Sequence, residues 1–220
     1  MGADSLEKVL AAWNASAELH SPNPGASSDG LQRAQADIGR PLPEDAVDLY
    51  RELDGGSLLH GNLNLLPLLP EGVTLAVTTS SDLLRSWDWP IPDELLIFGD
   101  NGAGDQFGIW LPTARDGQPL IVQVGETYGD DGNLAIVGDD LPSFLLGWTA
   151  YYLMLLRDEG ETGPALSELG LPAHLLELGD TDDDFFELLA WASPGLPDPR
   201  PDPYERGLTA AQVSSLARAA

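Results

Sequence analysis

Apolar residues in the first quarter of the chain recur at helical spacing. Between Leu6 and Leu19 they return about every 3.6 residues, the period of an amphipathic helix. A second helix is predicted over 31–38, after a loop at 21–30 that is rich in proline, glycine and serine. A third helix is predicted to start at Pro43, because proline suits the first turn, and to be stopped by Gly55-Gly56.

Short apolar runs bounded by turn residues predict a series of strands further along the chain. These runs lie at 63–69, 73–77, 95–98, 107–111, 120–124 and 134–137. Between the second and third runs, Ser81 or Asp82 is placed to cap a short helix that extends through Trp87. Residues 142–156 are apolar on almost every side, which predicts a helix buried deep in the core.

The last part of the chain is richer in proline, glycine and acidic residues. Short helices are predicted at 173–178 and 184–192, followed by a stiff proline-rich connector at 194–203. Thr209 and Gln212 have the spacing of a capping box, which predicts a closing helix after them.

Acidic residues greatly outnumber basic ones. The 36 acidic and 10 basic residues give a formal net charge of −26 at pH 7. A surface this negative repels nucleic acids and anionic lipids and attracts basic partners, and its self-repulsion favours a monomer. Nine of the 10 basic residues are arginine, and alanine, glycine, proline and leucine abound. A compositional bias of the whole proteome therefore stays open as the other explanation of the charge.

The absence of cysteine excludes disulfides, thiol catalysis and thiolate metal sites, and a cytoplasmic location is expected. The first residues, MGADSLEKVLAAW, lack the basic and then apolar layout of a secretory signal. Apolar stretches are shorter than the roughly 20 residues that a membrane helix needs.

The segment FGDNGAGDQFGIWLP, residues 98–112, places four glycines and two aspartates between apolar runs. A phosphate-binding loop is disfavoured, because the glycine spacing is wrong, a strand-like run follows and no basic residue is near. A calcium loop starting at Asp100 would put glycines at ligand positions and Leu111 in place of the closing glutamate. The acidic run 180–184 fails the same comparison. A β-hairpin turn is the preferred interpretation of the first segment.

No residue pattern predicts catalysis. His20, His60 and His174 lie in unrelated segments, without a His-Glu-x-x-His pair or a Gly-x-Ser-x-Gly elbow. Paired carboxylates cannot be singled out, since so acidic a chain offers many accidental pairs. We therefore expect no enzymatic activity, no cofactor and no metal.

Several short motifs follow one another in a fixed order over about residues 31–157. The motifs are Ile38-Gly39-Arg40-Pro41-Leu42-Pro43, Leu49-Tyr50, Asp54-Gly55-Gly56, Leu95 with Ile97-Phe98-Gly99, the turn from Gly102 to Asp105, and Ser143-Phe144. In their order and spacing they resemble the SUKH superfamily, which includes the fungal Smi/Knr cell-wall regulators and many bacterial relatives.

The resemblance implies an α+β fold in which helices flank a mainly antiparallel sheet, here over residues 1–160. Residues 161–220 are then a helical, proline-rich extension that is packed on or tethered to this domain. The resemblance also implies a non-catalytic binding protein, because many bacterial members are immunity proteins that neutralise toxin domains. Such toxins are often nucleases and hence basic. The alternative is a regulatory or scaffold protein that binds cellular partners through the same domain.

Contact with a protein partner is expected from two tryptophans and four aspartates. The tryptophans are candidate aromatic anchors, with core packing as the alternative. The aspartates lie on predicted turns and are expected to form an acidic rim at one end of the sheet, with simple solvation as the alternative. These residues are Trp87, Trp89, Asp100, Asp105, Asp130 and Asp131.

Overall fold

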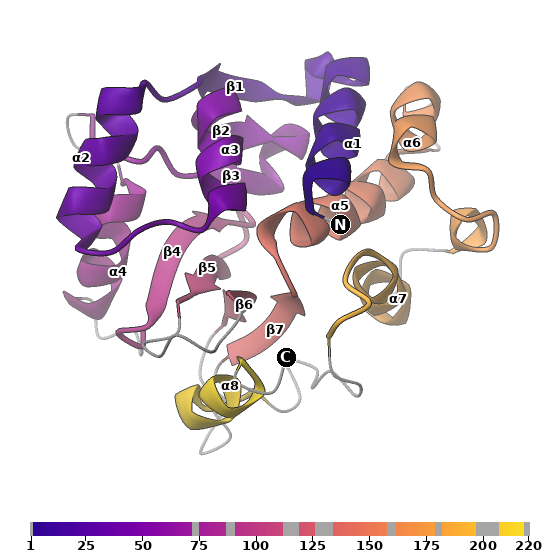
Figure 1. Cartoon of the computed structure of the whole chain (residues 1–220). Helices are drawn as coiled ribbons and strands as arrows, with labels where there is room; N and C mark the ends of the chain where they lie inside the picture. The colour runs from indigo at the N-terminus through magenta and orange to yellow at the C-terminus, as the bar shows by residue number, and fades with distance from the viewer. Residues whose placement is uncertain are drawn as a thin grey trace.

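Helices surround one β-sheet in the computed structural model of the chain (Figure 1). The structure describes residues 2–71, 75–86, 91–111, 119–125, 134–157, 162–178, 182–196 and 207–217. The strands are β1 (Ser21–Pro24), β2 (Leu53–Leu58), β3 (Leu63–Leu65), β4 (Leu95–Asp100), β5 (Gln106–Trp110), β6 (Leu120–Val124) and β7 (Leu134–Gly138). The α-helices are α1 (Gly2–Ala15), α2 (Ser28–Ile38), α3 (Glu44–Glu52), α4 (Val77–Ser86), α5 (Leu141–Leu155), α6 (Gly163–Leu169), α7 (Asp182–Ala192) and α8 (Ala210–Ala217). Single 3-10 turns are η1 (Ala17–Leu19), η2 (Leu59–Gly61) and η4 (Leu175–Glu177).

Within the described residues, seven strands form one sheet in chain order, and each pairs antiparallel with the next. Figure 1 shows them descending from β1 at the top to β7, with α8 below. Strands β4 to β7 are almost entirely buried, which explains why their sequences are continuous apolar runs. The α+β class with a mainly antiparallel sheet is therefore confirmed.

The two outer strands are protected in different ways. All residues of β1 are exposed, and Pro22 and Pro24 have no N–H with which to extend the sheet. The prediction of a loop over 21–30 was therefore wrong for β1, because proline is typical of loops and of edge strands alike. At the other edge, Leu134 of β7 exchanges two backbone hydrogen bonds with Leu208 (3.2 and 2.6 Å).

Gly55 and Gly56 lie inside β2, so the prediction that they stop a helix was wrong. Helix α3 ends at Glu52, and the glycines adopt φ values of +80° and +133°. A Cβ on Gly55 would lie 2.6 Å from the nitrogen of Pro67, and one on Gly56 would lie 2.6 Å from the Cα of Pro22. Glycine at both positions lets the backbone of β2 approach the chain on either side.

Helix α4 completes the sheet where β3 is too short to do so. Strand β3 pairs with β4 only at Gly99 and Asp100, so the beginning of β4 has a partner strand, β5, on one edge only. Ser81 of α4 donates to the carbonyl of Leu95 (3.1 Å) and accepts from the N–H of Ile97 (3.2 Å). Ser80 donates to the carbonyl of Ile97 (3.0 Å). Two buried hydroxyls thus replace strand pairing.

The predicted helix near Ser81 exists, but it starts at Val77, so Ser81 lies within it. The strand predicted over 63–69 is confirmed only for β3. Of the run 73–77, Val77 begins α4 and the other described residues, 75 and 76, belong to no helix or strand. The start of α4 and the run 73–77 were misjudged for the same reason, because a short apolar run is compatible with a strand and with a helix. The helix predicted over 173–178 is a single 3-10 turn, whereas α6 was not predicted.

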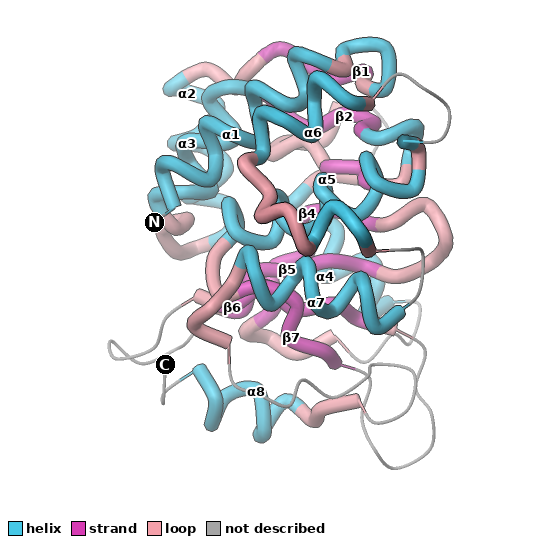
Figure 2. Tube along the Cα trace, turned by 90° about the vertical axis from the view of Figure 1, so that its right-hand side faces the viewer, coloured by secondary structure: helices cyan, strands magenta, loops and turns pink. Residues whose placement is uncertain are grey.

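Helix α5 is the centre of the helical layer. Twelve of its 15 residues are buried, as expected for a helix that is apolar on every side. Helices α1, α6 and α7 pack against it, and α1 also packs along α6 (Figure 2). The indole N–H of Trp13 in α1 donates to the hydroxyl of Thr149 in α5 (3.1 Å).

Two aspartates fix the beginning of α5. Asp140 caps the helix by accepting from the N–H of Ser143 (2.7 Å). Asp45 at the start of α3 accepts from the N–H of Leu141 (3.1 Å), which joins the two helix starts. Burial raises the pKa of Asp45, and the hydrogen bonds from Leu141 and Ala46 oppose that shift.

Replacing Ser81 tests whether the hydroxyls of α4 stabilise the edge of β4. Ser81→Ala leaves the buried N–H of Ile97 and carbonyl of Leu95 without this partner. We expect the free energy of unfolding to fall by about 1–3 kcal/mol in chemical denaturation. Ser86→Ala is the control, because Ser86 is exposed on the same helix and donates to the carbonyl of Leu83 within that helix. Equal stability of the two variants would contradict this role of Ser81.

Candidate functional site

The segment 101–105 forms the turn of the β4–β5 hairpin, which confirms the preferred interpretation of this glycine-rich stretch. The side-chain oxygen of Asn101 accepts from the N–H groups of Ala103 (2.9 Å) and Asp105 (3.1 Å), as in an Asx turn. The amide of Asn101 donates to the carboxylate of Asp105 (2.8 Å). The N–H groups of Ala103 and Asp105 are therefore bound within the turn.

The turn packs against η2, the connection between β2 and β3. Gly102 has φ of +70°, and a Cβ there would lie 2.5 Å from the carbonyl oxygen of Gly61. The amide of Asn64 donates to that carbonyl (3.3 Å) and to the carboxylate of Asp100 (2.8 Å). Asp100 also accepts from the N–H of Gly102 (2.8 Å). Asn64 and Asp100 thus join two turns at one end of the sheet.

A half-buried histidine, His20, contacts the start of η2. Leu59 and His60 both have positive φ values, 53° and 55°, which are unfavourable for residues other than glycine. The N–H of Leu59 donates to Nδ1 of His20 (3.2 Å), so the proton of the neutral ring lies on Nε2, which contacts the hydroxyl of Ser16 (3.1 Å). Burial is the main cause that lowers the pKa of His20 from 6.5 to about 4.

A cleft of about 840 Å³ lies beside these turns. One wall is the stretch from β1 into α2, the other is the chain that follows β3, and β2 contributes residues between them. The lining residues are Asn23, Pro24, Gly25, Ala26, Ser27, Gly30, Arg33, Asp54, Gly56, Asn64, Leu65, Leu66, Pro67, Leu68, Leu69, Pro70, Glu71 and Leu75. Because Asn64 also binds Asp100, the cleft and the hairpin turn are adjacent surfaces.

Asp54 is the half-buried carboxylate of this cleft. One of its oxygens, Oδ1, accepts from the N–H of Leu68 (2.7 Å), and its backbone carbonyl accepts from the amide of Asn23 (2.9 Å). Burial raises the pKa of Asp54, the hydrogen bond from Leu68 lowers it, and the charge of Glu71 raises it further. The cleft therefore concentrates negative charge next to partly exposed leucine and proline side chains.

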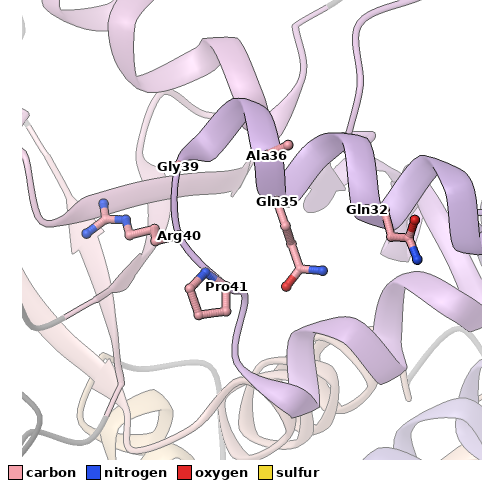
Figure 3. A pocket seen from close by; sticks show the side chains of 6 residues that line it. All are labelled: Gln32, Gln35, Ala36, Gly39, Arg40 and Pro41. Atoms are coloured by element: carbon pink, nitrogen blue, oxygen red, sulfur yellow. The ribbon is translucent and has the colours of Figure 1, made fainter.

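A second depression, of about 520 Å³, lies where α2 leads into α3. Figure 3 shows Gln35 projecting from α2 beside Pro41, whereas Arg40 extends to the other side. Gln35 accepts from the N–H of Leu42 (3.1 Å), and Arg40 donates to the carbonyls of Asp93 (3.0 Å) and Leu111 (3.4 Å). These polar groups hold neighbouring segments together, so the first cleft is the better candidate for binding.

The sequence matches the SMI1 / KNR4 family (SUKH-1) over residues 25–147, more than half of the chain. The chain belongs to this family. Comparison with curated protein sequences found no significant match. The SMI1 / KNR4 match confirms the resemblance inferred from the motifs, and it contains the hairpin turn and nearly all of the cleft. Helices α6, α7 and α8 lie beyond it.

Two of the six residues predicted to contact a partner lie in the described part of this SUKH-1 protein. Asp100 and Asp105 are at the same end of the sheet, partly buried and engaged within the turn. Trp87, Trp89, Asp130 and Asp131 lie outside the described residues. Partner binding by all six stays a prediction.

The sequence analysis did not assign a functional role to the cleft. The sequence analysis used Asp54 only as part of the motif Asp54-Gly55-Gly56. The signal that could have pointed to it is an acidic residue inside a strand, since Asp54 lies in β2. The cleft joins segments far apart in the chain, which no local pattern reveals.

Across the described ranges, no group of three or more histidine, cysteine or acidic residues is placed to hold a metal ion. The same part of the chain contains no helix with both the length and the apolar character needed to span a membrane.

His20 makes the stability of the protein depend on pH. Because its folded-state pKa lies below the usual 6.5, the unfolded chain takes up the proton first as pH falls. The contribution of His20 to the free energy of unfolding is therefore complete above pH 6.5 and is lost as pH falls toward 4. Between about pH 7 and pH 5 we expect the stability of the wild type relative to His20→Gln to drop by on the order of 1 kcal/mol, allowing for solvent screening.

Chemical denaturation at both pH values measures this difference. His174→Gln is the matched control, since His174 is exposed. A stability difference between wild type and His20→Gln that does not change with pH would show that His20 is not held neutral by its surroundings.

Proposed function

We propose that the protein is a non-catalytic immunity protein that binds and neutralises a basic toxin domain. Membership of the SMI1 / KNR4 family supports a binding function, because many bacterial members of the SUKH superfamily are immunity proteins. The observation that carries the choice of a basic partner is the large excess of carboxylates over cations, with a net charge of −26.

The cations of the described residues are mostly engaged locally. Within these residues, four ion pairs are formed, by Lys8 with Asp4, by Arg51 with Asp48, and by Arg85 with Asp82 and Asp93. Arg157 donates to the carbonyl of Leu176 (2.6 Å). Three of these pairs join residues three or four positions apart, and the fourth joins Arg85 to Asp93. They therefore leave most of the acidic surface uncompensated. That surface is available to attract a cationic partner.

The end of the sheet with the hairpin turn and the cleft is the surface that we propose to face the toxin domain. Asp100 and Asp105 hold the turn in one conformation, so little ordering entropy is lost on binding there. Contact of the partner with Trp87, Trp89, Asp130 and Asp131 stays a prediction from the sequence.

Co-expression tests the proposal. We expect the C-terminal domain of a large secreted protein encoded directly upstream to stop bacterial growth, and this protein to restore growth when produced with it. The two purified proteins should form a complex whose association rate falls by about tenfold or more between low and physiological salt, as electrostatic steering requires.

An inactive variant of the toxin domain serves as the control for the binding measurement, since it keeps the surface and removes toxicity. Failure to restore growth, together with no measurable complex, would overturn the proposal. Stable binding to a cellular housekeeping protein instead would favour a regulatory scaffold.

A further inference from the structure

We propose that the cleft between Asp54 and Glu71 binds an arginine side chain presented by the protein partner, an inference that rests on the proposed function. The cleft is a concave site of about 840 Å³, larger than a single side chain requires, so it admits a side chain together with its flanking backbone. The proposed function does not say which chemical groups of the partner are recognised. The cleft indicates one such group.

The carboxylate of Asp54 is held in place and has one oxygen left for a ligand. The N–H of Leu68 fixes Oδ1 at 2.7 Å, and the amide of Asn23 fixes the backbone carbonyl of the same residue at 2.9 Å. In the described residues, Oδ2 of Asp54 has no hydrogen-bond or ion-pair partner. A carboxylate oriented in this way is a preorganised acceptor for a cationic donor.

Glu71 adds a second negative charge that acts on Asp54 at the same cleft. Arg33 is the one cation among the lining residues, and it is exposed and forms no ion pair with Asp54 or Glu71 within the described residues. The two carboxylates are therefore not neutralised by the protein itself. A cation from outside would relieve the repulsion between them.

The walls of the cleft favour arginine over lysine. Pro67, Leu69 and Leu75 line the cleft and are only partly buried, so they offer apolar surface to a long aliphatic stem. A guanidinium is planar, weakly hydrated and rich in donors, and it therefore suits a site that combines apolar walls with carboxylate acceptors. An ammonium loses more hydration on entering such a site.

Titration of the full chain with N-acetyl-arginine methylamide, followed by amide chemical shifts in NMR, tests this inference without knowledge of the partner. We expect saturable shifts at Asp54, Leu68 and neighbouring cleft residues. The neutral isostere N-acetyl-citrulline methylamide should produce none, and N-acetyl-lysine methylamide should bind more weakly. Asp54→Asn combined with Glu71→Gln should weaken binding of the arginine probe by about tenfold.

Glu168→Gln combined with Glu177→Gln is the matched control. Both residues are exposed on α6 and η4, away from the cleft lining, and the charge change is the same. This pair should leave binding of the arginine probe unchanged. Equal weakening by both double variants, equal shifts with citrulline, or shifts spread over the whole acidic surface would overturn the inference.

The same variants separate this inference from the proposed function. If the toxin domain binds the cleft variant and the control variant equally well, the cleft does not recognise the partner, although the immunity function stands. If the arginine probe binds the cleft but no toxin domain is neutralised, the immunity function fails and the cation site remains.

Discussion

A helix that is apolar on all sides imposes the main constraint on this structure. Helix α5 is apolar on nearly every side, so it needs the sheet on one side and other helices around most of the rest. Its aromatic residues continue the core of the sheet, with Phe144 and Trp148 both packed against Phe107 of β5 (ring centroids 4.9 and 4.7 Å apart). Helices α1, α6 and α7 then cover what the sheet leaves open.

This constraint gives the residues beyond the family match a structural role. The match ends at residue 147, within α5, so half of the helix and all of α6 and α7 follow it. Leu166 and Leu169 of α6 and Leu188 and Leu189 of α7 are buried in the same core cluster as α5. These helices close the core of the domain, and for that reason truncation before α6 would expose apolar surface on both α1 and α5.

The elements predicted best from the sequence are those that are buried on nearly all sides. Strands β4 to β7 and helix α5 are buried on nearly all sides, so their apolar runs were identified with small errors at the ends. The capping box before α8 also forms, with Thr209 donating from its backbone N–H to Gln212 (2.8 Å). Prediction failed where tertiary contacts decide, as in β1 with its prolines and at Gly55-Gly56. The cleft was beyond reach because it is assembled from three distant segments.

The electrostatics of the protein act at two ranges, and they have different consequences. The net charge of −26 creates a field that decays over about 10 Å in salt solution, so it governs how fast a basic partner arrives. Asp54 also acts at short range, because its carboxylate accepts from the N–H of Leu68 and lines the cleft together with partly buried leucine and proline residues. A general acidic bias would produce the first effect without the second. An oriented carboxylate that lines a cleft beside the hairpin turn, with one oxygen unpartnered among the described residues, is therefore the feature that compositional bias alone does not explain.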